Sequence, residues 1–127
     1  MTKTIRIGLL GTLAVLAATG AAQGQSAKLS CSGSEPFWSL AIAGDRARFQ
    51  AANPELAGGG SDFTGKATAV ANHRPATSVW RGRSASGQSD LVVLIVPSGC
   101  EMPSGDKVPY RVWLSLPDGA ALTGCCN

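Results

Sequence analysis

The sequence predicts an all-β fold, a small antiparallel barrel (or sandwich) of about eight short strands held together by disulfides. Segments with alternating apolar and polar residues recur about every ten residues, as in small β domains. The 127 residues include 16 Gly and 7 Pro, which suits frequent turns. No stretch of helical periodicity follows the N-terminal region. A closed barrel is favoured, because closure removes exposed strand edges.

Residues 1–22 have the three parts of a secretory signal peptide. A short basic start precedes the apolar run from Ile7 to Ala18, and Gly20-Ala21-Ala22 supplies small residues for cleavage. The apolar run is shorter than the roughly 20 residues that a membrane-spanning helix needs. We therefore expect a single β domain over residues 23–127, exported to the periplasm and without a membrane span.

The mature domain is close to neutral. Removing Lys3 and Arg6 from the 11 basic residues leaves 9 against 8 acidic ones. With aromatic residues at 6%, neither a basic face nor aromatic platforms for nucleic acid are expected. Lys28-Leu29-Ser30 precedes Cys31 far from the apolar run, which is a poor lipidation signal, so we expect no lipid anchor.

Four strands are expected in the first half of the domain, at residues 29–32, 37–43, 46–51 and 63–72. In the second of them, Trp38, Leu40 and Ile42 fall on one face. Gly44-Asp45 is a tight turn that joins this strand to the third as a hairpin. The glycine-rich stretch 53–62 is too flexible for a strand or a helix, so we expect a surface loop there.

Four more strands are expected at residues 77–83, 91–96, 110–116 and 121–126. In the first of these, Val79, Arg81 and Arg83 alternate with smaller residues and Trp80. The apolar segment 91–96 is expected to be covered on both sides or to lie in the centre of a closed sheet. Pro117-Asp118-Gly119 turns the seventh strand into the last, so the chain ends in a hairpin.

An even number of cysteines in a small exported domain predicts two disulfides. The four are Cys31, Cys100, Cys125 and Cys126. Adjacent Cα atoms lie about 3.8 Å apart, less than the roughly 4.4–6.8 Å of a relaxed disulfide, so Cys125 and Cys126 should find different partners. In a closed barrel the first and last strands meet, which brings Cys31 beside Cys125 and Cys126. Leu29 and Cys31 share a face, as do Leu122 and Cys126, so we favour Cys31 with Cys126 and Cys100 with Cys125. The alternative is a reduced vicinal pair with a thiol redox or soft-metal role.

Motifs occur at both ends of the mature domain. They are C-S-G-S-E-P-F-W at 31–38, Cys100-Glu101-Met102 leading to Asp106 and Pro109-Tyr110, and L-T-G-C-C at 122–126. In these motifs the chain resembles a largely uncharacterised family of small exported bacterial proteins and lipoproteins, with C-x-G-x-E-P-F-W near the start and G-C-C at the end. Residues 44–90 carry no matching motif, and Pro103-Ser104-Gly105 lengthens the usual link. The resemblance implies a periplasmic or envelope location and no activity.

Two groups of residues are candidate binding sites. Glu35, Phe37 and Trp38 place a carboxylate beside two aromatic rings. They are either a ligand clamp or a strand entry whose aromatics fill the barrel mouth. The second group is Arg81, Arg83 and Arg111. If these lie on neighbouring strands, they form either an anion-binding patch or an ordinary solvated strand face.

Motifs for catalysis are absent from the sequence: it has no G-x-S-x-G, no H-E-x-x-H and no phosphate-binding glycine loop. The single histidine, His73, has no second His and no acidic cluster nearby in sequence, so we expect no metal and no cofactor. We therefore predict a non-enzymatic binding or interaction module of the periplasm or envelope. Its partner would be a small ligand or an envelope protein.

An alternative function is inhibition of c-type lysozyme. The run Ser84-Ala85-Ser86-Gly87 is similar to the serine-rich loop of small barrel inhibitors of that enzyme. Such a loop inserts a serine hydroxyl among the catalytic carboxylates. On this hypothesis, Ser84, Ser86 and Gly87 form the inhibitory loop and lysozyme is the partner.

Overall fold

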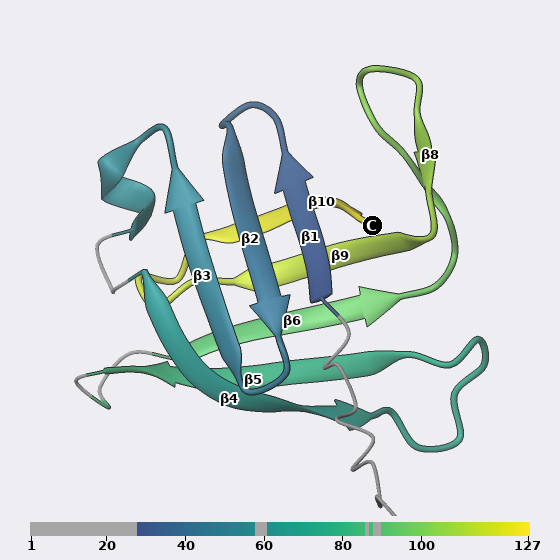
Figure 1. Ribbon diagram of the computed structural model, residues 1–127, viewed down its shortest axis with the longest axis horizontal. Helices are drawn as coiled ribbons and strands as arrows, with labels where there is room; N and C mark the ends of the chain where they lie inside the picture. The colour runs from purple at the N-terminus through teal and green to yellow at the C-terminus, as the bar shows by residue number, and fades with distance from the viewer. Residues whose placement is uncertain (1–27, 58–60, 86, 88–89) are drawn as a thin grey trace, which may run out of the picture.

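The computed structural model describes residues 28–57, 61–85, 87 and 90–127, which form a closed antiparallel barrel of eight strands (Figure 1). The strand order around the barrel is β1-β10-β9-β6-β5-β4-β3-β2, so the first and last strands are neighbours. The predicted all-β barrel is thereby confirmed. The predicted signal peptide, residues 1–22, lies outside the described residues. Within the residues that the structure does describe, no helix is long and apolar enough to cross a membrane.

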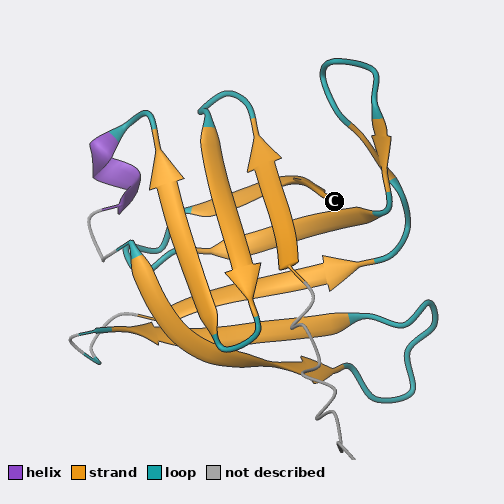
Figure 2. Ribbon diagram, in the orientation of Figure 1, coloured by secondary structure: helices purple, strands orange, loops and turns teal. Residues whose placement is uncertain are grey.

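All eight predicted strands are present, with ends shifted by up to a few residues (Figure 2). They are β1 (Lys28–Gly33), β2 (Trp38–Ala43), β3 (Arg46–Ala51), β4 (Asp62–Ala69), β5 (Ser78–Ser84), β6 (Asp90–Val96), β9 (Tyr110–Ser115) and β10 (Ala121–Cys126). Two short strands that the sequence did not predict, β7 (Cys100–Glu101) and β8 (Lys107–Val108), pair as a hairpin between β6 and β9. This hairpin projects from the barrel (Figure 1).

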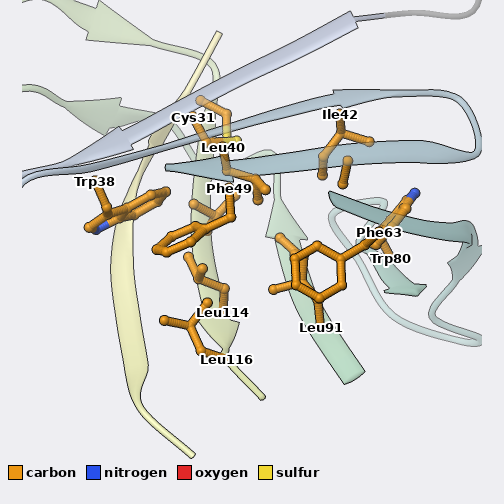
Figure 3. Packing of buried hydrophobic residues seen from close by; sticks show 14 residues of the cluster. Cys31, Trp38, Leu40, Ile42, Phe49, Phe63, Trp80, Leu91, Leu114 and Leu116 are labelled. Atoms are coloured by element: carbon orange, nitrogen blue, oxygen red, sulfur yellow. A yellow bond between two sulfur atoms is a disulfide. The ribbon is translucent and has the colours of Figure 1, made fainter. Parts of the chain in front are cut away.

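Side chains that alternate along the strands fill the barrel interior (Figure 3). The face predicted for β2 is confirmed, because Trp38, Leu40 and Ile42 are buried, and β3 likewise buries every second residue. The rings of Trp38 and Phe49 stack with centroids 6.2 Å apart. The Trp80 indole N–H donates to the carbonyl oxygen of Gly44 at 3.1 Å, which links β5 to the β2–β3 turn. The interior is thus a packed core.

The loop predicted over residues 53–62 is wrong in two respects. Its first part is a 3₁₀ helix, η1 (Pro54–Ala57), and Asp62 already belongs to β4. The helix forms because the Asn53 side-chain carbonyl accepts the N–H of Glu55 at 3.0 Å, which begins a turn locally. Leu56 then packs against the core cluster, which holds the turn on the barrel.

Burial along β6 distinguishes the two environments expected for the apolar segment. Leu91 and Val93 are fully buried, whereas Val92 and Leu94 are half-buried on the opposite face. The strand therefore lies within a closed sheet and is not covered on both sides. Its apolar outer face is available at the surface.

Gly65 of β4 and Gly82 of β5 lie directly opposite each other, where the two strands approach closely. A Cβ at Gly65 would lie 2.5 Å from the Gly82 Cα and still closer to the Arg81 carbonyl oxygen. We expect Gly65→Ala to lower the free energy of unfolding by about 1–3 kcal/mol, because backbone has to move. Urea denaturation of Gly65→Ala and of a control at the neighbouring exposed position, Ala67→Ser, measures this. Equal losses in both variants would contradict the close-approach explanation.

Candidate functional site on the outer face of the barrel

The disulfides join Cys31 to Cys126 and Cys100 to Cys125, as the sequence favoured. The first closes the barrel between β1 and β10, and the second ties the β7–β8 hairpin to β10. None of the four thiols is free, so in this state the vicinal cysteines offer no thiol pair for redox or metal chemistry. Two disulfides are consistent with an oxidising, exported environment.

The structure separates the aromatic residues of the 35–38 group. Trp38 is 5% exposed inside the barrel, whereas Phe37 is 67% exposed on the turn between β1 and β2. Glu35 lies on the same turn, with a φ of 61°. The predicted strand 37–43 in fact begins at Trp38. Only Trp38 of the three packs inside the barrel. Phe37 and Trp38 both border a surface hollow of about 270 Å³, but its lining does not include Glu35, so the three side chains do not form one clamp.

Packing around Trp38 explains several residues of the sequence motifs at the two ends of the domain. A Cβ at Gly33 would lie 2.7 Å from the indole Cε2 of Trp38, and one at Gly124 would lie 2.7 Å from its Cζ2. The two glycines therefore make room for the ring from two strands at opposite ends of the chain. The Cys31–Cys126 disulfide lies in the same core cluster. Residues of both terminal motifs thus share the core with Trp38, and their role there is packing.

A surface hollow lies over β4, β5 and β6, and we call it the cationic hollow. Its volume is about 640 Å³, and it is lined by Thr64, Gly65, Lys66, Arg81, Gly82, Arg83, Asp90, Leu91 and Val92. Lys66 and Arg81 lie directly opposite each other on β4 and β5, and both are exposed. Arg83 pairs with Asp90 of β6, with 3.1 Å between Nε and Oδ1.

Lys66 and Arg81 have no acidic partner in the part of the chain that the structure describes. The ion pairs there are Arg83 with Asp90 and Arg48 with Asp62. Like charges directly opposite on adjacent strands are unfavourable. The two cations therefore leave positive charge uncompensated over the cationic hollow.

The three predicted arginines do not form one cluster. Arg81 and Arg83 share β5, but Arg111 is on β9, and β6 lies between these strands. Arg81 pairs with Val92 of β6, whereas Arg111 pairs with Val96. Four residues along a strand span about 13 Å. The condition that all three arginines lie on neighbouring strands is therefore not met, and the cation directly beside Arg81 is Lys66 of β4.

The predicted lysozyme-binding loop is only partly described. Ser84 is the last residue of β5 and the first residue of the turn that follows, and it is 9% exposed. Gly87 is exposed with a φ of 71°, and its N–H donates to the Ser84 carbonyl oxygen at 2.7 Å. Ser86 lies outside the described residues. Ser84 is turned away from the surface, and lysozyme inhibition stays a prediction.

A second hollow lies between the β7–β8 hairpin and the outer faces of β1 and β10, with a volume of about 650 Å³. Its lining includes Ser30, Ser32, Ser39, Met102, Asp106, Lys107 and Val108. The Ser104 hydroxyl donates to Oδ2 of Asp106 at 3.0 Å, which engages that carboxylate within the hairpin. The lining carries one acid and one base and has no excess of either charge.

His73 lies in the loop between β4 and β5. Its Nδ1 is 3.0 Å from Oγ1 of Thr77 and 3.1 Å from the carbonyl oxygen of Pro75. Over the described residues, no group of three or more His, Cys, Asp or Glu side chains is arranged to hold a metal ion.

No family model, no curated protein and no solved structure matches the chain.

Proposed function

We propose that the protein is a non-enzymatic binding module of the periplasm or cell envelope, and that it binds an anionic ligand in the cationic hollow. The observation that carries this proposal is the position of Lys66 directly opposite Arg81 with no acidic partner among the described residues. The two disulfides and the resemblance to small exported bacterial proteins support the location.

An anion bound in the cationic hollow would relieve a repulsion that the fold otherwise carries. Directly opposite residues on paired strands have Cβ atoms about 4.5–5.5 Å apart, so one phosphate or carboxylate group can reach both Lys66 and Arg81. The Arg81 guanidinium presents donors in a fork that suits these groups, and the Lys66 ammonium adds a second charge. Arg83 contributes less, because Asp90 already engages it.

Neutralising Lys66 and Arg81 should weaken anion binding. With inorganic polyphosphate as the probe at low ionic strength, we expect Lys66→Gln/Arg81→Gln to raise the Kd about tenfold or more, since charge-assisted hydrogen bonds contribute about 1.5–3 kcal/mol each. Isothermal titration calorimetry measures the Kd. Added salt should weaken binding of the unchanged protein.

The control variant is Lys28→Gln/Lys107→Gln, which has the same net charge but changes exposed residues outside the cationic hollow. Its Kd should stay within about twofold of that of the unchanged protein, because screening limits the effect of distant charges. A loss equal to that of Lys66→Gln/Arg81→Gln would show binding by overall charge or at the hairpin, and would overturn the proposed site.

A further inference from the structure

We infer that the cationic hollow is one border of a membrane-docking surface, and that its occupant is the headgroup layer of an anionic lipid bilayer. This inference rests on the proposed function, since it uses Lys66 and Arg81 as the anion-binding groups. It goes further by naming the kind of anion and by including an apolar surface beside the hollow.

An apolar row crosses three strands next to these cations. Val79 of β5 pairs with Leu94 of β6, and Leu94 pairs with Trp113 of β9. Each alternates with residues of the core, so all three point outward. Trp113 is 44% exposed. We call Val79, Leu94 and Trp113 the apolar row.

Cations border the apolar row on both sides. On one side, Arg81 pairs with Val92, two residues along the strands from the apolar row, or about 7 Å. Lys66 lies opposite Arg81. On the other side, Arg111 is two residues from Trp113 and pairs with Val96. Arg111 is not part of the cationic hollow, but it forms the second cationic border of the proposed membrane-docking surface.

The charge pattern favours an anionic bilayer as the occupant. Tryptophan prefers the headgroup level of a membrane, where its ring is apolar and its N–H can reach polar groups. Basic residues beside it attract anionic lipids. No acidic side chain stands in the apolar row or directly opposite Lys66, Arg81 or Arg111, and Asp90, the acidic residue in the lining of the cationic hollow, is paired with Arg83. Two copies placed face to face would oppose cationic borders, which disfavours a second copy as the occupant.

Tryptophan fluorescence reads this surface directly. Trp38 and Trp80 are 5% and 1% exposed, so changes in quenching by acrylamide report mainly on Trp113. With vesicles of 30% phosphatidylglycerol in phosphatidylcholine at low salt, we expect a blue shift of the emission and weaker quenching. Pure phosphatidylcholine vesicles should give neither. Lys66→Gln/Arg81→Gln should lower vesicle binding about tenfold or more, as should high salt, whereas Lys28→Gln/Lys107→Gln should not.

A second variant tests the apolar row apart from the charges. Trp113→Ser keeps every cation and should reduce vesicle co-sedimentation several-fold while leaving the polyphosphate Kd unchanged. Because Trp113 is exposed, the variant should remain folded, which circular dichroism checks.

The outcomes separate this inference from the proposed function. Polyphosphate binding that depends on Lys66 and Arg81, without any Trp113 response to phosphatidylglycerol vesicles, would overturn membrane docking and keep the anion site. Loss of both would overturn both. Equal binding to pure phosphatidylcholine, or shielding of Trp113 by self-association in the absence of vesicles, would also overturn the anionic bilayer as the occupant.

Discussion

Replacing Cys31 and Cys126 together with alanine is expected to lower the free energy of unfolding by about 4–5 kcal/mol, which is much of the stability of a small domain. This disulfide spans a sequence separation of 95 residues, so its loss releases most of the chain in the unfolded state. It also lies in the core, so its removal takes buried atoms from the packing around β1 and β10. Urea denaturation without reductant gives the free energy.

The other disulfide provides the comparison. Cys100 and Cys125 are separated by 25 residues, so Cys100→Ala/Cys125→Ala should lose about 3–4 kcal/mol from the same entropy. This bridge holds the hairpin on β10 and takes no part in the core cluster. A Cys31→Ala/Cys126→Ala variant as stable as the unchanged protein, or more stable than the Cys100→Ala/Cys125→Ala variant, would contradict a closure role for the first bridge.

Trp38→Ala is expected to cost about 3–5 kcal/mol of unfolding free energy, as large-to-small changes of buried aromatics do. The indole is 5% exposed, stacks on Phe49, and fills space that Gly33 and Gly124 leave open. Neither glycine has a side chain that could move into the space left by the indole.

The neighbouring residue is a matched control. Phe37→Ala removes an aromatic ring one position away that is 67% exposed, and it should change the free energy within about 0.5 kcal/mol. Chemical denaturation of both variants, followed by far-ultraviolet circular dichroism, measures the contrast. Similar effects of the two substitutions would contradict the burial of Trp38 and the exposure of Phe37.

The alternation of apolar and polar residues was the strongest signal in the sequence, because every second side chain of a half-buried strand points into the core. Trp38, Leu40 and Ile42 were assigned to one face for this reason. The same alternation favoured the pairing of Cys31 with Cys126, because Leu29 and Cys31 share a face of the first strand and Leu122 and Cys126 share a face of the last. The hairpin strands β7 and β8 escaped detection because two residues are too few to show any period.

The candidate site was only half predictable. Arg81 and Arg83 stood out by their spacing, but Lys66 was missed, because β4 is rich in alanine and its pairing with β5 follows an eight-residue loop. Trp113 alternates with the buried residues Val112 and Leu114 along β9. Its position beside Leu94 and Val79 depends on the pairing of β6 with β9 across the unpredicted hairpin.

Cys125 and Cys126 point to opposite faces of β10, and this arrangement affects oxidative folding. A slip of β10 by one residue would exchange the faces of the two sulfurs, so Cys125 would meet Cys31 and Cys126 would meet Cys100. That isomer has the same mass and the same number of bridges as the native protein, yet every inward side chain of β10 would face solvent. The two bridges by themselves therefore do not select the strand register, and it is the burial of the inward side chains of β10 in the core that favours the native isomer over the slipped one.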